Sequence, residues 1–136
     1  MPAQTTIDQY NALAGTLISR GKTPAGASLG AGAQQVFDAS VGASDFITVE
    51  GSAGPGATAA GDLSVQVFPY MADGVTISGT PLPAVAATGY AGTLSGGYSQ
   101  LLQKYDVAGV DMVRVIFKNN NAGALPVVCS WREESW

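Results

Sequence analysis

Few side chains in this sequence of 136 residues could do chemistry. Histidine, the commonest general base and metal ligand, does not occur. The single cysteine, Cys129, lies in the apolar run LPVVCSW; no cationic residue adjoins it, which favours a small buried hydrophobe over a reactive thiol. The ten acidic residues fall mostly in predicted turns and give no support for a catalytic carboxylate pair. We therefore expect no enzyme, no cofactor and no metal site.

Aromatic side chains remain as possible binding groups. Tyr90 and Tyr98 fall in the segment TGYAGTLSGGYSQ, and Tyr70 follows an apolar strand. Exposed tyrosines stack on sugar rings or anchor protein interfaces. The competing interpretation, which we favour, is that these tyrosines cap the ends of a core. Trp136 ends the sequence, and we expect it to dock on its own domain or on a neighbour.

The composition excludes several classes of partner. Charged residues make up 12% of the chain, against about 25% in an ordinary domain, while 46% is hydrophobic. Either neighbours cover an uncharged surface, or the chain has a simple bias toward alanine and glycine. The six basic residues are scattered and the net charge is −4, so we expect no nucleic-acid partner. No secretory signal or membrane-spanning stretch is recognisable, which predicts synthesis in the cytoplasm.

Short alternating strands dominate the sequence after Gln34. The segment VDMVRVIFK places Val113, Val115 and Phe117 on one face, while Arg114 marks the other face as solvated or paired. Similar runs are SDFITVEG, DLSVQVFPY and PVVCSW, with Gly, Pro, Asn and Asp between them. This pattern predicts an all-β fold, a single β-sandwich or jelly-roll-like domain.

An internal repeat supports one core built from two similar units. The segment at 34–51, QQVFDASVGASDFITVEG, resembles 102–119, LQKYDVAGVDMVRVIFKN, with a turn two residues shorter in the second copy. The likeness continues into 63–67 and 125–129. Each unit is therefore predicted to run strand, turn, strand, loop, strand. The repeated aspartates Asp38, Asp45, Asp106 and Asp111 are expected to bond backbone N–H groups in turns rather than to hold a metal.

The first 33 residues differ in character from the rest. Spacing of apolar residues favours a short helix over 5–19, although LAGTLISR would also suit a first strand. A glycine- and alanine-rich connector follows at 23–33. We therefore divide the chain into a helix or arm with its connector, 1–33, and a β-sandwich domain, 34–136. The arm would lay its apolar side chains on a partner or pack back on the sandwich; these side chains are Ile7, Tyr10, Leu17 and Ile18.

The paired pattern Phe/Tyr-Asp…Asp-x-Val-x-Val, followed by KNNNAGALPVVCSW, resembles small β-sandwich virion proteins of tailed bacteriophages, capsid decoration (cement) proteins above all. The likeness covers about residues 34–136. It lies in the general pattern and not in a diagnostic motif, so no functional residues of that family are assigned to this chain. It implies a homo-oligomer, often a trimer, that clamps the major capsid protein or other virion subunits. Carbohydrate-binding β-sandwich modules show the same pattern. For such a module the three tyrosines would be the platform.

Overall fold

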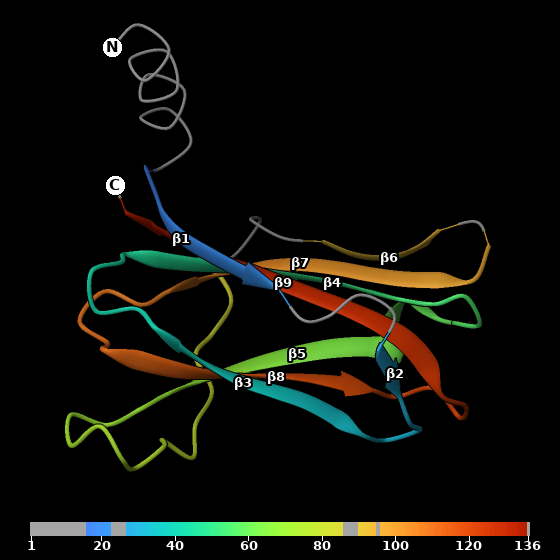
Figure 1. Ribbon diagram of the computed structural model, residues 1–136, viewed down its shortest axis with the longest axis horizontal. Coiled ribbons are helices and arrows are strands. Elements are labelled where there is room, and N and C mark those ends of the chain that lie inside the picture. Colours follow the sequence, from blue (N-terminus) through green and yellow to red (C-terminus); the bar gives the residue numbers. More distant parts are fainter. Residues whose placement is uncertain (1–15, 23–26, 86–89, 95, 136) are drawn as a thin grey trace, which may run out of the picture.

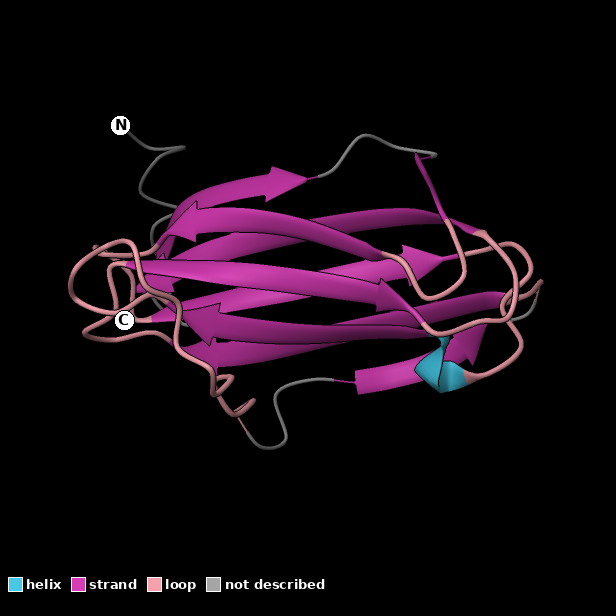
Figure 2. Cartoon of the chain, turned by 90° about the horizontal axis from the view of Figure 1, so that it is seen from below, coloured by secondary structure: helices cyan, strands magenta, loops and turns pink. Residues whose placement is uncertain are grey.

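The computed structural model describes residues 16–22, 27–85, 90–94 and 96–135. They form an all-β sandwich of two antiparallel sheets that face each other (Figure 1). Sheet A has the order β1 (Thr16–Lys22), β9 (Leu125–Ser135), β4 (Phe46–Ala53), β7 (Tyr98–Asp106) and β6 (Tyr90–Leu94), and β2 (Ala27–Leu29) also pairs with β9. Sheet B has the order β3 (Gln34–Ser40), β8 (Met112–Asn119) and β5 (Leu63–Pro69). The single-turn helix η1 (Ala60–Asp62) lies at one end of the strands (Figure 2).

The strand order confirms the predicted fold class. Strands β1, β9, β4 and β7 facing β3, β8 and β5 follow the order of a jelly roll, except that β6 pairs with β7 in sheet A. The edge of β5 is instead lined by the segment after it, where Ser78 N–H donates to Pro69 O at 2.9 Å and Leu82 N–H donates to Val67 O at 2.7 Å. Prolines in this segment prevent further pairing there, which protects an otherwise open edge.

The internal repeat corresponds to two interlocked units. The first unit is β3-β4-β5 and the second is β7-β8-β9, but in each unit the middle strand crosses to the other sheet. Strand β8 therefore lies between β3 and β5, and β4 lies between β9 and β7. If β3, β4 and β5 are exchanged with β7, β8 and β9, each strand keeps equivalent neighbours. The strand order thus has pseudo-two-fold symmetry. The sequence likeness thus reflects equivalent places in the two sheets.

The core lies between the sheets and consists of the inward-facing residues of both units. Buried members come from every strand of sheet B and from β4, β7 and β9 of sheet A. The most deeply buried include Ile47, Val49, Leu63, Val67, Val113, Val115, Phe117, Leu125 and Cys129. The alternation that the sequence predicted for Val113, Val115 and Phe117 is confirmed.

The Phe117 ring fills a place that a glycine leaves open. Extending the repeat alignment makes Gly51 of β4 the counterpart of Phe117 of β8. A Cβ atom on Gly51 would lie 2.9 Å from Phe117 Cε1 and 2.8 Å from Leu63 Cδ2. The large side chain in one sheet and the missing one in the other let the sheets approach at this point.

Asn119 ties three segments together at one end of the sandwich. Its side chain is fully buried, and its amide donates to Leu29 O at 2.9 Å, Gly30 O at 3.3 Å and Gly123 O at 3.0 Å. Because a buried amide without partners is costly, these bonds hold β2 against the β8–β9 turn.

The segment before Gln34 is part of the sandwich, which corrects the predicted division at that residue. Strand β1 pairs with the last six residues of β9, from Thr16 opposite Ser135 to Lys22 opposite Ser130, and β2 pairs with β9 further along. Residues 16–19 are therefore strand, not the helix favoured over 5–19. The alternative of a first strand at LAGTLISR holds for its described part, and residues 5–15 lie outside the described residues.

Replacing Gly51 with alanine should destabilise the protein by about 1 to 3 kcal/mol, because the new methyl group overlaps Phe117 and Leu63. Urea unfolding would measure the change. A matched control is Gly79→Ala, where an added Cβ meets nothing within 4 Å and the free energy of unfolding should move by less than about 0.5 kcal/mol. Adding Phe117→Leu to Gly51→Ala should recover part of the loss. Equal stability of the two alanine variants would contradict this packing.

Candidate interaction surfaces

The structure does not bring the three tyrosines together on one platform. Tyr70 follows β5, and its N–H donates to Met112 O where β8 begins, whereas Tyr98 begins β7 at the opposite end of the sandwich. Tyr98 is half-buried and lies against Gly54, where an added Cβ atom would be 2.8 Å from Tyr98 Cδ1. Tyr90 begins β6, opposite Leu102 in the register.

The residues predicted for the N-terminal arm are only partly described. Leu17 and Ile18 lie on β1, whose backbone pairs with β9. Ile7, Tyr10 and Trp136 lie outside the described residues. The side chains of Leu17, Ile18 and Tyr90 are likewise not described, so these partner contacts stay predictions.

Tyr70 belongs to a charged cluster on the outer face of sheet B that spacing alone did not reveal. Arg114 donates from Nε to Asp38 Oδ1 at 2.9 Å and from Nη2 to Asp38 Oδ2 at 3.2 Å, and the Tyr70 hydroxyl donates to Asp38 Oδ2 at 2.9 Å. The Arg114 hydrogen bonds hold the pKa of Asp38 below its ordinary value, while desolvation and Asp38 raise the pKa of Tyr70. Asp38 is thus an ion-pair partner across strands β3 and β8, not the turn residue predicted.

Three other aspartates, Asp62, Asp73 and Asp106, accept hydrogen bonds that stabilise loops. Asp106 accepts the N–H of Ala108 at 3.0 Å, as predicted for the repeated aspartates. Asp62 accepts the N–H of Thr58 at 2.6 Å and the side-chain amide N–H of Asn121 at 2.7 Å. These bonds lower the pKa of Asp62, and the bond from Thr58 has the largest effect. Asp73 accepts the Thr76 hydroxyl at 2.6 Å, which lowers its pKa. Within the described ranges, no three acidic or cysteine side chains gather as a metal site would require.

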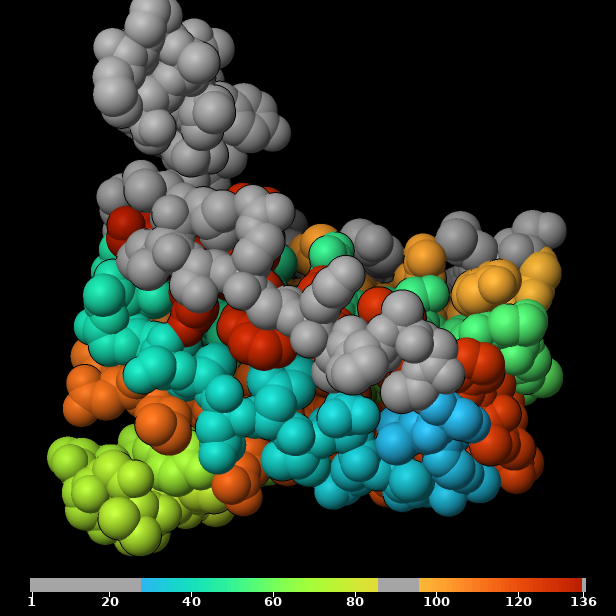
Figure 3. Space-filling model, viewed as in Figure 1, coloured from blue at the N-terminus to red at the C-terminus, as the bar shows by residue number. Residues whose placement is uncertain are grey.

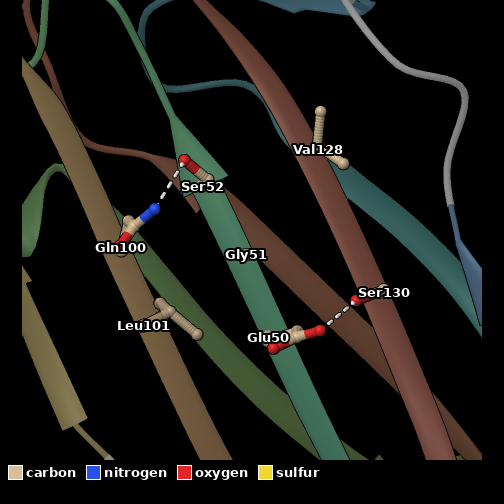
Figure 4. Close-up of a pocket in the computed structure, with 7 residues that line it drawn as sticks. All are labelled: Glu50, Gly51, Ser52, Gln100, Leu101, Val128 and Ser130. Carbon is tan, nitrogen blue, oxygen red and sulfur yellow. Dashed lines mark hydrogen bonds between the residues drawn. The ribbon is translucent and has the colours of Figure 1, made fainter.

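The outer face of sheet A carries a small groove lined largely by polar residues (Figure 4). It lies over β7, β4 and β9 and has a volume of about 200 Å³. Gln100 donates to Ser52 at 3.4 Å and Ser130 donates to Glu50 at 3.0 Å across it, so its polar groups already bond one another. Val128 stands beside them and is 37% exposed.

A larger slot opens between the two sheets at the β3 edge. Its volume is about 340 Å³, and its lining includes Asp38, Ser40, Ser44, Trp131 and Glu133. The Trp131 ring stacks on Phe37 with ring centroids 4.3 Å apart. In the space-filling view, atoms of β9 (red) are seen beside β3 (cyan) on this side (Figure 3). The slot combines an indole wall with carboxylates and hydroxyls.

The loop after β5 projects from the body of the sandwich (Figures 1 and 3). Two of its apolar side chains are exposed to solvent. Met71 is 56% exposed and Val75 is 79% exposed. The loop is nevertheless ordered by hydrogen bonds, because Met71 N–H donates to Thr76 O at 2.7 Å and Asp73 accepts the N–H groups of Val75 and Thr76. Exposed apolar side chains on a preorganised loop are typical of contact surfaces.

These features define the class of the protein as an all-β sandwich of two antiparallel sheets. No described helix is both long and apolar enough to cross a membrane.

Comparison with known proteins does not assign a family. No family model and no curated protein matches the chain. Similar solved structures include the SPBc2 prophage-derived protein YomS, with 17% identity, 86% of this chain and 96% of that chain covered, and a TM-score of 0.43. Another is CBM28, a carbohydrate-binding module specific for non-crystalline cellulose, with 14% identity, 79% and 73% coverage, and a TM-score of 0.48. PliG of Aeromonas hydrophila, a periplasmic inhibitor of g-type lysozyme, has 9% identity, 88% coverage of both chains and a TM-score of 0.41. Likenesses this weak carry no argument about function.

Replacing Asp38 with asparagine should remove a pH-dependent contribution to stability. Because the folded pKa of Asp38 lies below its ordinary value of 3.8, the ionised carboxylate stabilises the fold above about pH 4, and this is lost as pH falls through the folded pKa. The pair is about one-third exposed, so Asp38→Asn should cost at most about 1 kcal/mol at pH 7. Urea unfolding of both proteins from pH 7 to pH 2.5 should show the difference closing below pH 4. Asp111→Asn, at an exposed residue, is the control, and a difference that persists unchanged to pH 2.5 would exclude the ion pair as its cause.

The Cys129 thiol should be inert in the folded protein. Its side chain is fully buried, and desolvation raises the pKa of the thiol to about 12, so almost no thiolate forms at pH 8. A chromogenic disulfide reagent at that pH should leave the native protein unmodified but react with one thiol per chain in guanidinium chloride. Rapid labelling without denaturant would show that this strand opens to solvent.

Proposed function

We propose that this protein is a non-catalytic structural component of a virus particle, a head decoration (cement) protein that stabilises the capsid shell. The observation that supports it is the nature of the described surface. Charged groups there are few, and several bond within the chain, as Arg114 with Asp38 does. Met71, Val75, Val36 and Val128 meanwhile expose apolar surface. Interface cores are depleted in charge in this way.

In this role the partner is the major capsid protein or another virion subunit, and the protein acts as a homo-oligomer, with a trimer favoured. Edge strands β3 and β6 are available for contact with neighbouring subunits. The carbohydrate-binding alternative depended on a tyrosine platform, and Tyr70 and Tyr98 lie at opposite ends of the sandwich.

Mass spectrometry of gradient-purified particles tests the proposal. We expect peptides of this chain in the particle at a fixed ratio to the major capsid protein, because a decoration protein occupies repeated sites on the shell. Particles that lack the protein should take up the recombinant chain and withstand heat or chelation better afterwards. Absence from purified particles would overturn the proposal. A ratio of only a few copies per particle would place the protein in the tail and overturn the decoration role.

A further inference from the structure

We propose that the slot between β3 and β9 binds an arginine or lysine side chain of a partner protein, with Glu133 as its acceptor. This locates a contact within the proposed function, and the identification of the donor as a protein side chain rests on that function.

Glu133 is the residue that points to a ligand. It is only 5% exposed and lines the slot, yet it forms no hydrogen bond or ion pair through its side chain with any described residue. Fully enclosed side-chain oxygens in the described part all have partners, so the carboxylate oxygens of Glu133 face the space of the slot. A carboxylate withdrawn from water is costly unless it is paired, and an incoming cation removes that cost.

The surrounding strands supply no cation of their own at this register. Glu133 lies opposite Ile47 of β4 and Ser19 of β1, neither of which is charged. Gly21 lies opposite Trp131 and contributes no side chain beside the slot. Arg114, the basic residue bonded to Asp38, is committed to that pair on the outer face.

The lining suits a guanidinium or ammonium group at the end of an aliphatic chain. Stacking on Phe37 holds the Trp131 ring in place as an apolar wall. A guanidinium presents parallel N–H donors that match a carboxylate, and its plane packs well on aromatic rings. A calcium ion fits less well, because it takes six to eight oxygen ligands and no three acidic groups gather here among the described residues.

The indole N–H resonance of Trp131, identified in a Trp136→Phe background, reports occupation of the slot. Titration with N-acetyl-arginine amide should shift it saturably, whereas N-acetyl-citrulline amide, which has the same shape without the charge, should bind at least about tenfold more weakly. Glu133→Gln should weaken arginine binding by about the same factor without lowering the thermal midpoint. Glu134→Gln is the matched control, because Glu134 is equally buried but accepts the Thr48 hydroxyl at 2.7 Å on the other face of the sheet.

Three results would overturn the proposal: no shift with the arginine probe, equal shifts with arginine and citrulline, or full binding by Glu133→Gln. A saturable shift with cellobiose alone would assign the slot to a glycan instead. If Glu133→Gln does not fold, the comparison of arginine with citrulline on the unaltered chain still decides. All these measurements use the isolated protein. A negative result would therefore overturn the slot proposal alone, whereas absence of the chain from purified particles would overturn the decoration role.

Discussion

Each sheet of this protein depends on a central strand that the other half of the sequence supplies. Strand β8 of the second unit carries both ladders of sheet B, and β4 of the first unit links β7 and β9 in sheet A. Neither unit can therefore complete a sheet alone. The Asp38–Arg114 pair, the slot at the β3 edge and the groove on sheet A all lie across strands of different units, so these three features exist only once the two units have combined.

The packing of Phe117 on Gly51 shows where the two units must differ. Equivalent positions that face each other across the core cannot both carry a ring, because the sheets would be forced apart. One large and one absent side chain solve this problem at constant total volume. The chain therefore keeps the repeat in its topology and departs from it in side-chain size at this pair of positions.

Much of the sandwich could be predicted from its alternating apolar residues, but the sheet edge at β1 could not. The apolar pattern of β9 stops near Trp131, while the strand continues through Arg132, Glu133 and Glu134 to Ser135. That charged extension is the partner of β1. Because the apolar pattern does not reveal the extension, the spacing around Leu17 suits a helix as well as a strand. Alternation shows which face a residue occupies but not its register. The pairing of Asp38 with Arg114 and the isolation of Glu133 both depend on register.

The interlocked units have a consequence for the ancestry of the chain. Two equivalent three-strand units that exchange their middle strands have the topology of a strand-swapped homodimer whose subunits have been joined end to end. Gene duplication and fusion would produce this arrangement directly. Covalent joining turns assembly of the halves into an intramolecular event, which no longer weakens on dilution. The two halves now differ at their edges, because the β3 edge opens into a slot whereas the β5 edge is lined by a proline-containing segment.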